Sequence, residues 1–363
     1  MSEVLYRKYR PQKFEDIVGE GHVVKVLRAS VERERISHAY LFSGPRGTGK
    51  TSAARIFARA INCLNSDTKK RPDNTCEICK EFLSAIALDL VEIDAASSRG
   101  IDEIRALKEA VEPLPFKSRY KVFIIDEVHM LTKEAFNALL KTLEEPPRHV
   151  IFILATTEID KVLDTIISRT QHFEFRKIAE EELELALKKI TEKEKIKIDS
   201  ESLGILSVLA EGSLRDAQSM LDQVLSFSEG SVDATQVRDI FGLPSRERIN
   251  GMVESFLRKD AKTSFKIVRE AMAENMDSAA LFKLLIRNFR FLIYLKIDRE
   301  FEEELKKYIS EAEMAFFKKI TSEFEVNDME KILIELNFAY SNLNWAYLPE
   351  LPLELAILKI SQI

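Results

Sequence analysis

The first half of the chain alternates between short apolar runs and segments in which apolar residues recur with the period of a helix. The runs are rich in Val, Ile, Phe and Leu and lack the polar alternation of strands that face water on one side. Such runs are typical of a parallel sheet that helices cover on both faces. The predicted strands span residues 38–43, 90–94, 120–126, 149–155 and 171–175. This half is therefore expected to be an α/β domain.

After residue 178 amphipathic helical patterns replace the strand-like runs, so no further strand is expected. The predicted helices span residues 181–193, 200–210, 214–226 and 234–240. The breakers Gly242 and Pro244 follow and indicate a hinge. The pattern predicts an α/β domain over residues 1–178, a small helical domain over 179–242 and an all-α domain over 243–363. The last domain carries no chemical motif, and we interpret it as a packing or oligomerisation module.

Composition adds limits on the class of protein. The chain has 363 residues, more than one compact core holds, and 45% of them are hydrophobic. A formal net charge of −6 excludes a polycation that coats nucleic acid, so any DNA contact must be local. The N-terminus lacks the apolar core of a signal peptide and no long apolar run occurs, so we expect a cytoplasmic protein without membrane contact. Three cysteines, an odd number, argue against a disulfide framework.

Residues 44–51 fit the phosphate-binding pattern G-x-x-x-x-G-K-S/T, between a predicted strand and a predicted helix at 52–61. The glycines let backbone N–H groups and the helix N-terminus point at phosphate oxygens. Lys50 is expected to reach the β- and γ-phosphates of ATP, and Thr51 to hold Mg²⁺. The residues expected around the nucleotide are Gly44, Pro45, Arg46, Gly47, Thr48, Gly49, Lys50, Thr51 and Ser52. A glycine-rich turn that carries a lysine by chance is the alternative, which the flanking elements disfavour.

A second nucleotide motif lies at residues 122–127, where four apolar residues precede two acids. Asp126 ends the predicted strand and is expected to bind the Mg²⁺ shell, while Glu127 would polarise the attacking water as a general base. The alternative is that the acids cap the following helix. Together with the P-loop, this Walker B pattern predicts ATP hydrolysis.

Three further residues stand where a nucleotide site could use them. Thr157 follows a predicted strand next to the expected γ-phosphate position. Arg169 precedes the last strand, although a lone arginine is ordinarily a solvated surface residue. Arg215 lies in the first turn of a predicted helix, where a cation opposes the helix dipole and therefore hints at an anionic ligand. Ser213 and Asp216 nearby are explained as helix capping residues.

Four stretches make the chain resemble the γ/τ family of bacterial DNA polymerase III, the AAA+ ATPases of clamp loaders. They are YRKYRP at 6–11 with Phe14, HAYLF at 38–42, IDEVHML at 125–131 and NALLKTLEEPP at 137–147. The resemblance covers the whole chain. It implies an AAA+ P-loop domain with a parallel sheet, a small helical lid domain and an all-α collar domain.

The resemblance also implies a hetero-pentamer with δ and δ′ subunits and further copies of this chain, in which ATP lies between neighbours. Arg169 would act as an arginine finger on the next subunit's ATP. The family's Ser-Arg-Cys motif has Thr170 in place of its cysteine here, which leaves the guanidinium unaffected. Thr157 would be sensor 1 and Arg215 sensor 2. Three N-terminal residues would close over the adenine: Tyr9, Arg10 and Pro11.

The implied function is to open the β sliding clamp and load it onto primer-template DNA, with no polymerase active site in this chain. ATP would lock a spiral of subunits, and hydrolysis would release the loaded clamp. Three basic residues match places at which similar proteins follow the DNA phosphate backbone. They are Arg99, Arg105 and Lys141. Ordinary solvated surface charges are the alternative for each of them.

The cysteines match a zinc module that relatives carry as an insertion, here residues 62–82. The matching residues are Cys63, Cys76 and Cys79. Continuing the family spacing C-x₂-C-x₂-C would put a fourth ligand at position 82, which is Phe82 here. A closed structural zinc site uses four ligands, so Asp67, Asp73 or water would have to complete the shell. Reduced thiols without a metal are the alternative.

Two other functions remain open. The sequence Asp-Glu-Val-His resembles a D-E-x-H box, so the chain could be a helicase or a branch-migration motor. Such a helicase needs a second RecA-like domain, whereas the last third of the chain is predicted to be helical. A non-catalytic scaffold subunit of a clamp loader would lack the P-loop lysine or the Walker B acids, which are present here.

Overall fold

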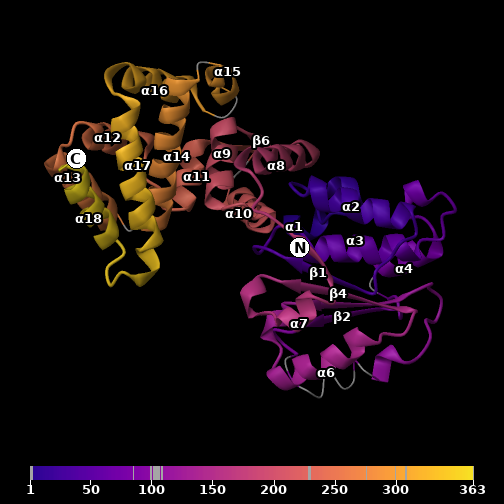
Figure 1. Ribbon diagram of the computed structural model, residues 1–363. Helices are drawn as coiled ribbons and strands as arrows, with labels where there is room; N and C mark the ends of the chain where they lie inside the picture. Colours follow the sequence, from indigo (N-terminus) through magenta and orange to yellow (C-terminus); the bar gives the residue numbers. More distant parts are fainter. Residues whose placement is uncertain are drawn as a thin grey trace. The chain divides into compact units, whose positions relative to one another are not determined.

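The computed structural model describes residues 3–84, 86–98, 100, 107, 109–227, 230–274, 276–298, 300–306 and 309–362. Contacts divide the chain into two compact units. One comprises Met1–Leu183 with Gly212–Asp216, and the other Glu184–Glu211 with Ala217–Ile363. In Figure 1 the first unit is mainly indigo and magenta and contains the sheet, while the second is mainly orange and yellow and helical.

A five-stranded sheet in the order β2-β3-β4-β1-β5 forms the centre of the first unit. The strands are β1 (Ala39–Ser43), β2 (Leu90–Asp94), β3 (Lys121–Asp126), β4 (Val150–Thr156) and β5 (Gln171–Glu174). Every pairing between neighbours is parallel. The predicted parallel sheet and its five strands are confirmed.

Burial along the strands follows their place in the sheet. β1 and β4 are buried at every residue, and β3 at all but its two ends. The edge strand β2 has no fully buried residue, and Phe173 is the buried residue of β5. Burial on both faces therefore holds for the three central strands and not for the two edges, because an edge strand has a neighbour on one side only.

Helices cover both faces of the sheet, with α2 and α3 on one face and α6 on the other (Figure 1). Successive strand residues point to opposite faces, so alternate residues feed two separate cores. Tyr40 and Phe42 pack in the core with α2 and α3. Leu41 and Phe123 pack in the core with α6. The helices of this unit include α1 (Leu5–Lys8), α2 (Gly21–Glu32), α3 (Lys50–Asn62), α4 (Glu77–Leu83), α6 (Lys133–Glu144) and α7 (Asp164–Ile167), and its 3-10 turns are η1 (Phe14–Asp16), η2 (Thr68–Lys70), η3 (Val128–Met130) and η4 (Ile159–Lys161).

Helices dominate the chain after the sheet, and all four helices predicted there are confirmed. They are α8 (Glu180–Glu194), α9 (Ser200–Leu209), α10 (Leu214–Phe227) and α11 (Ala234–Ile240). The prediction that strands end at residue 178 is wrong in one detail, because β6 (Lys197–Ile198) and β7 (Ser231–Val232) form a short parallel pair. Strands of two residues are too short to leave a periodic signal in the sequence.

The last part of the chain is helical, as predicted. Its elements are α12 (Arg246–Leu257), α13 (Ala261–Ala273), α14 (Ser278–Ile297), α15 (Phe301–Leu305), α16 (Glu311–Glu323), α17 (Val326–Ser341), η5 (Leu343–Trp345) and α18 (Leu351–Ile360). α14 begins where the Asp277 carboxylate accepts hydrogen bonds from two backbone N–H groups, and it buries Phe282 and Phe289. Over the described ranges, no helix is both long and apolar enough to cross a membrane.

Candidate nucleotide site

The P-loop joins the end of β1 to the start of α3. Gly44, Gly47 and Gly49 adopt positive φ angles of 136°, 78° and 101°, which residues with a side chain rarely adopt. Gly47 also has no room for a side chain, because a Cβ atom there would lie 1.9 Å from Ser213 Oγ. The N-cap residue Gly49 supplies no side-chain cap to the first turn of α3. Its backbone N–H groups therefore remain suited to an anion such as phosphate.

Lys50 is held inside the P-loop. Its Nζ donates to the carbonyl oxygens of Gly44 at 2.7 Å and of Pro45 at 2.8 Å. The residue is 6% exposed, and this burial lowers the pKa of the ammonium group, against the opposing effect of Glu127 and Asp126. A partly desolvated cation beside a glycine-rich loop is suited to bind phosphate oxygens.

The two motifs predicted from the sequence meet at the carboxyl end of β3. Thr51 Oγ1 donates a 2.7 Å hydrogen bond to Asp126 Oδ2. A hydroxyl and a carboxylate are hard oxygen ligands of the kind that Mg²⁺ prefers. The two groups predicted to share the metal ion, which come from segments far apart in the sequence, thus lie side by side.

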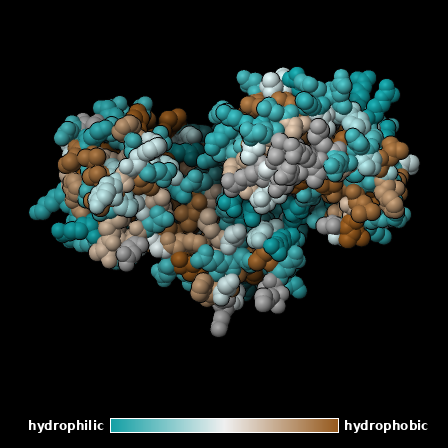
Figure 2. All heavy atoms as spheres, turned by 90° about the horizontal axis from the view of Figure 1, so that it is seen from below, coloured by the Kyte–Doolittle hydropathy of each residue, from teal (hydrophilic) through white to brown (hydrophobic). Residues whose placement is uncertain are grey.

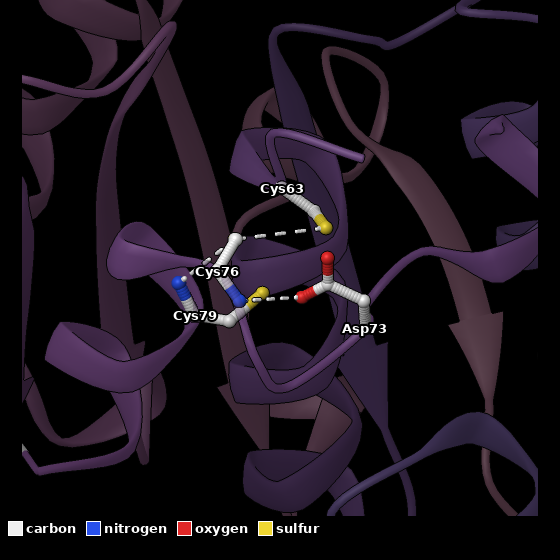
Figure 3. Close-up of side chains that lie close together, drawn as sticks. All are labelled: Cys63, Asp73, Cys76 and Cys79. Atoms are coloured by element: carbon white, nitrogen blue, oxygen red, sulfur yellow. Dashed lines mark hydrogen bonds between the residues drawn. The ribbon is translucent and has the colours of Figure 1, made fainter. Parts of the chain in front are cut away.

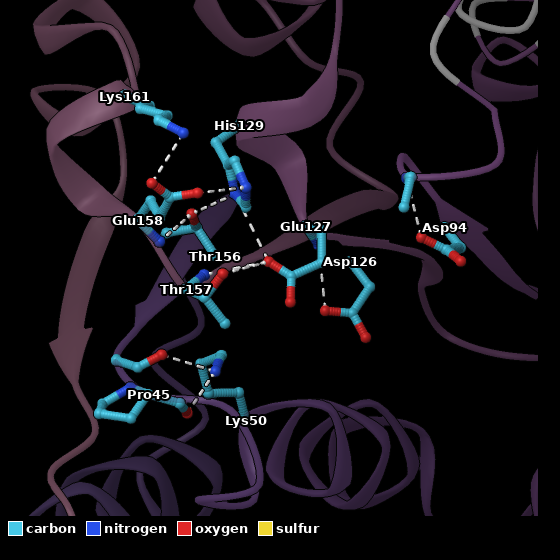
Figure 4. Close-up of polar contacts among 12 residues, drawn as sticks. Pro45, Lys50, Asp94, Asp126, Glu127, His129, Thr156, Thr157, Glu158 and Lys161 are labelled. Carbon is cyan, nitrogen blue, oxygen red and sulfur yellow. Dashed lines mark hydrogen bonds and ion pairs between the residues drawn. The ribbon is translucent and has the colours of Figure 1, made fainter. Parts of the chain in front are cut away.

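Glu127 follows Asp126 in the left-handed region, with φ at 49°. Its Oε2 accepts hydrogen bonds from the backbone N–H of Thr157 at 3.1 Å and from Thr157 Oγ1 at 2.9 Å. Figure 4 shows Glu127 between Thr157 at the end of β4 and Asp126, above Lys50 of the P-loop. The structure therefore brings together the predicted base, the predicted sensor threonine and the P-loop lysine.

The N-terminal segment also reaches the P-loop helix. Arg10 Nε donates to Ser52 Oγ at 3.4 Å, and burial together with the neighbouring Arg55 lowers the pKa of the Arg10 guanidinium. Tyr9 and Pro11 on either side of Arg10 are half-buried. The predicted adenine segment thus lies against the first turn of α3.

Arg215 belongs by its contacts to the first unit. Its guanidinium carbon lies 5.2 Å from the centre of the Tyr6 ring. Ser213 caps α10 by accepting a 3.2 Å bond from the Asp216 N–H, as expected. The backbone N–H of Leu214 donates to the carbonyl of Gly47 at 3.1 Å. The start of α10 is thereby hydrogen-bonded to the P-loop itself.

Arg169 lies just after α7, and within the described part of the chain its guanidinium bonds to residues of α6 and of the α7 segment. The guanidinium donates to Glu144 Oε1 and to the carbonyl of Thr165, both at 2.8 Å, and to Ser168 Oγ at 3.4 Å. Its side chain is 36% exposed. This placement is compatible with a role outside the subunit's own nucleotide site.

The three cysteines predicted to bind zinc lie together with the carboxylate of Asp73, which precedes Cys76 in the chain. One ligand atom from each of Cys63, Asp73, Cys76 and Cys79 lies within 4.8 Å of the others (Figure 3). Phe82 is buried in the core beside α3 instead. The fourth candidate donor is therefore Asp73 and not the residue at position 82. Two residues separate Asp73 from Cys76, as two separate Cys76 from Cys79, so the sequence does contain this spacing.

Asp73 is held by the backbone of the same loop. Its Oδ1 accepts from the N–H of Thr75 at 2.9 Å and of Cys76 at 3.0 Å. Burial by itself would raise the pKa of this carboxyl, but the backbone N–H groups lower it well below its usual range. Burial raises the pKa of the Cys79 thiol.

The predicted DNA contacts are only partly visible. Lys141 lies on α6 and is exposed. Arg99 and Arg105 lie outside the residues that the structure describes.

Comparison with known proteins covers almost all of the chain. Residues 19–179 match the family model described as DNA polymerase III, delta subunit. Residues 182–230 match that of the DNA polymerase III clamp loader subunit, ATPase lid domain. Residues 232–363 match that of DNA polymerase III subunits gamma and tau domain III.

Among individual proteins, the chain is 40% identical over 361 residues to DNA polymerase III subunit tau of Bacillus subtilis (strain 168), covering 99% of this chain and 63% of that subunit. It is 36% identical over 358 residues to DNA polymerase III subunit gamma of Buchnera aphidicola subsp. Acyrthosiphon pisum (strain APS), covering 99% and 98%. The solved branch migration motor RuvB of Thermotoga maritima aligns with 69% of this chain and 79% of its own at 17% identity, with a TM-score of 0.48.

Proposed function

Because the chain belongs to the DNA polymerase III gamma/tau family of clamp loader ATPase subunits, we propose that it hydrolyses ATP to load a ring-shaped β sliding clamp onto primer-template DNA. The observation that carries the proposal is the 2.7 Å contact between Thr51 and Asp126, with Lys50 and Glu127 beside it. These groups supply the cation, the metal ligands and the base that phosphoryl transfer to water requires.

Each residue of the site receives a role in this proposal. Lys50 binds the β- and γ-phosphates, and Glu127 orients the attacking water and accepts its proton. Thr51 and Asp126 would hold Mg²⁺, which when bound neutralises charge on the phosphate oxygens. Thr157 and Arg215 would sense the nucleotide. The Tyr9 to Pro11 segment would cover the adenine.

Assembly with other subunits completes the proposed site. Arg169 would act in trans on a neighbour's ATP, and the neighbours would be δ, δ′ and further copies of this chain. Exposed apolar side chains support subunit contacts by the proposed collar, and α17, η5 and α18 carry several of them: Phe338, Trp345, Leu355 and Leu358. Figure 2 shows that apolar residues, in brown, break up the polar surface of the molecule.

The finer assignments belong to the same proposal. The domains would be the ATPase domain 1–178, the lid 179–242 and the collar 243–363. Lys141, with Arg99 and Arg105, would contact the DNA backbone, and the protein would act in the cytoplasm. The described part of the chain contains one five-stranded parallel sheet and one two-residue strand pair, which does not favour a helicase with two RecA-like domains.

The proposal predicts how hydrolysis depends on partners. The chain mixed with its partner subunits, clamp and primed DNA is expected to release phosphate faster than the same subunits without clamp and DNA. Subunits with clamp alone and with DNA alone are the controls. Turnover that ignores both would contradict clamp loading but not ATP hydrolysis, whereas no turnover in any mixture would contradict both.

The cysteine cluster fits a structural zinc ion. Cys63 Sγ and Cys76 Sγ lie 4.0 Å apart, and two sulfurs on one tetrahedral zinc lie about 3.8 Å apart, given a Zn–S bond of about 2.3 Å. Asp73 supplies an oxygen donor of a type that zinc accepts. We propose that zinc is bound by three thiolates and the Asp73 carboxylate, and that it stabilises the insertion without a part in hydrolysis.

Asp73 therefore predicts a change in metal content. Asp73→Asn keeps an oxygen acceptor for the loop but removes the anionic ligand. It is expected to weaken zinc binding at least tenfold, since losing even an outer partner of a ligand costs about 10–100-fold. Asp73→Cys is expected to bind zinc at least as tightly as the parent. Zinc content after chelator-free purification and competition with a chromogenic chelator measure both, and equal affinity for Asn and Asp would exclude Asp73 as a ligand.

A further inference from the structure

A buried histidine borders the proposed general base. The His129 side chain is 5% exposed, and its Nδ1 lies 3.4 Å from Glu127 Oε2. The same nitrogen lies 2.9 Å from Thr156 Oγ1. None of the roles assigned above uses this histidine, although it touches the residue expected to activate water.

The imidazole is fixed on its other side by a second carboxylate. His129 Nε2 lies 3.2 Å from Glu158 Oε1, and Glu158 Oε2 pairs with Lys161 Nζ at 2.8 Å. Carboxylate oxygens only accept hydrogen bonds, and each ring nitrogen faces one, so the ring that fits both contacts donates from Nε2 to Glu158 and from Nδ1 toward Glu127. The Glu158 backbone N–H also donates to Thr156 Oγ1 at 3.0 Å. Both edges of the ring are thus anchored to the end of β4, which restricts its rotation.

Among the described residues, the contacts of the Glu127 carboxylate fall on one oxygen. The two bonds from Thr157 and the contact with His129 all involve Oε2. In Figure 4 the other oxygen points away from Thr157 and His129, toward the side on which Lys50 lies. The left-handed backbone of Glu127, with φ at 49°, is a conformation that persists where its surroundings impose it. One oxygen is therefore anchored and the other faces the P-loop.

We propose that His129 is a positioning residue for Glu127: the imidazole, anchored by Glu158 and Thr156, keeps Oε2 at Thr157 so that Oε1 faces the attacking water. This inference rests on the proposed function, in which Glu127 is the base. A base oriented by a third group is a recurrent arrangement in activated nucleophile sites. In this role His129 acts through Glu127 and not by touching the nucleotide or the water.

A buried histidine that merely fills space predicts a different outcome. Its loss would lower stability and would disturb nucleotide binding and turnover alike. A positioning residue acts through Glu127, so its loss lowers kcat and leaves binding of ATP nearly unchanged. Its loss also lowers the rate no further once Glu127 has been replaced by a residue that cannot act as a base.

The test compares variants in the assembled clamp loader with clamp and primed DNA. His129→Ala is expected to lower kcat by about 10–100-fold, the effect of misplacing a catalytic group by about 1 Å, with KM changed less than about twofold. His129→Asn can place an amide N–H near the position of Nδ1 and is expected to recover most of kcat. In a Glu127→Gln background, His129→Ala is expected to lower the residual rate no further.

The matched control is His149→Ala, because His149 is a half-buried histidine outside the site that contacts the carbonyl of Val111 at 3.3 Å. It should leave kcat within about twofold. An unchanged kcat in His129→Ala, equal losses in kcat and ATP binding, or an undiminished effect in the Glu127→Gln background would overturn the proposal. Full activity of Glu127→Gln alone would instead contradict the proposed function, so the two failures are distinguishable.

Discussion

Replacing Arg169 with alanine is expected to lower ATP hydrolysis by the assembled clamp loader by about 10³-fold or more, while ATP binding by the isolated chain stays unchanged. Arginine fingers contribute about 10³–10⁵ in kcat because the guanidinium neutralises charge that develops in the transition state. Phosphate release by the assembly and nucleotide titration of the isolated chain measure the two quantities. Loss of binding in the isolated chain would mean that Arg169 serves its own subunit's site.

The contacts that Arg169 makes in this structure are weak enough to be exchanged for a contact with phosphate. Its partner Glu144 is 49% exposed, and surface pairs of this kind are worth about 0–1 kcal/mol. The guanidinium can therefore exchange Glu144 for a phosphate at little cost. Arg148→Ala is the matched control, since Arg148 is an exposed arginine of the same unit. Full activity of Arg169→Ala in the assembly would exclude a function in trans.

Replacing Lys50 with alanine is expected to weaken ATP binding at least about 100-fold, equivalent to about 2.7 kcal/mol. The buried ammonium can meet the phosphates with a full positive charge, and charge-assisted bonds are stronger than neutral ones. Titration with a fluorescent ATP analogue measures the change. Binding within a few-fold of the parent would contradict the assignment of the P-loop.

The Lys50→Ala variant should still fold, so weaker ATP binding can be attributed to the missing ammonium group. Pro45 keeps a hydrogen bond after the change, because Thr48 Oγ1 also donates to its carbonyl at 2.9 Å. The carbonyl of Gly44 does lose the Lys50 bond. Lys25→Ala on the exposed face of α2 is the matched control. Thermal unfolding of both variants without nucleotide separates loss of binding from loss of structure.

The sheet was predictable because its central strands are continuous apolar runs in the sequence. Ile124 and Phe152 must be apolar, since both faces of the sheet are covered. The pair β6 and β7 was not predictable, because two residues per strand leave no pattern. The exposed edges β2 and β5 were found only because Ile93 and Phe173 lie in short β-branched or aromatic segments.

The nucleotide site also contains both residues that the sequence predicts and residues that only the fold brings together. Lys50, Thr51 and Asp126 follow from local motifs, because a phosphate loop needs fixed residue types at fixed spacing. His129 could not be assigned a neighbour from the sequence, since its partners Thr156 and Glu158 come from another strand end. Asp73 was open among several candidates: its spacing before Cys76 favours it over Asp67, and the folded loop places it among the sulfurs.

The packing of Gly47 against Ser213 limits how the phosphate loop can be exchanged. The motif leaves this position free, yet here the glycine has a φ of 78° and a Cβ would meet Ser213 Oγ at 1.9 Å. Its carbonyl also accepts from Leu214. The loop therefore cannot simply be replaced by a P-loop from another protein. A segment that fits the motif but has a side chain at position 47 would collide with Ser213 at the start of α10.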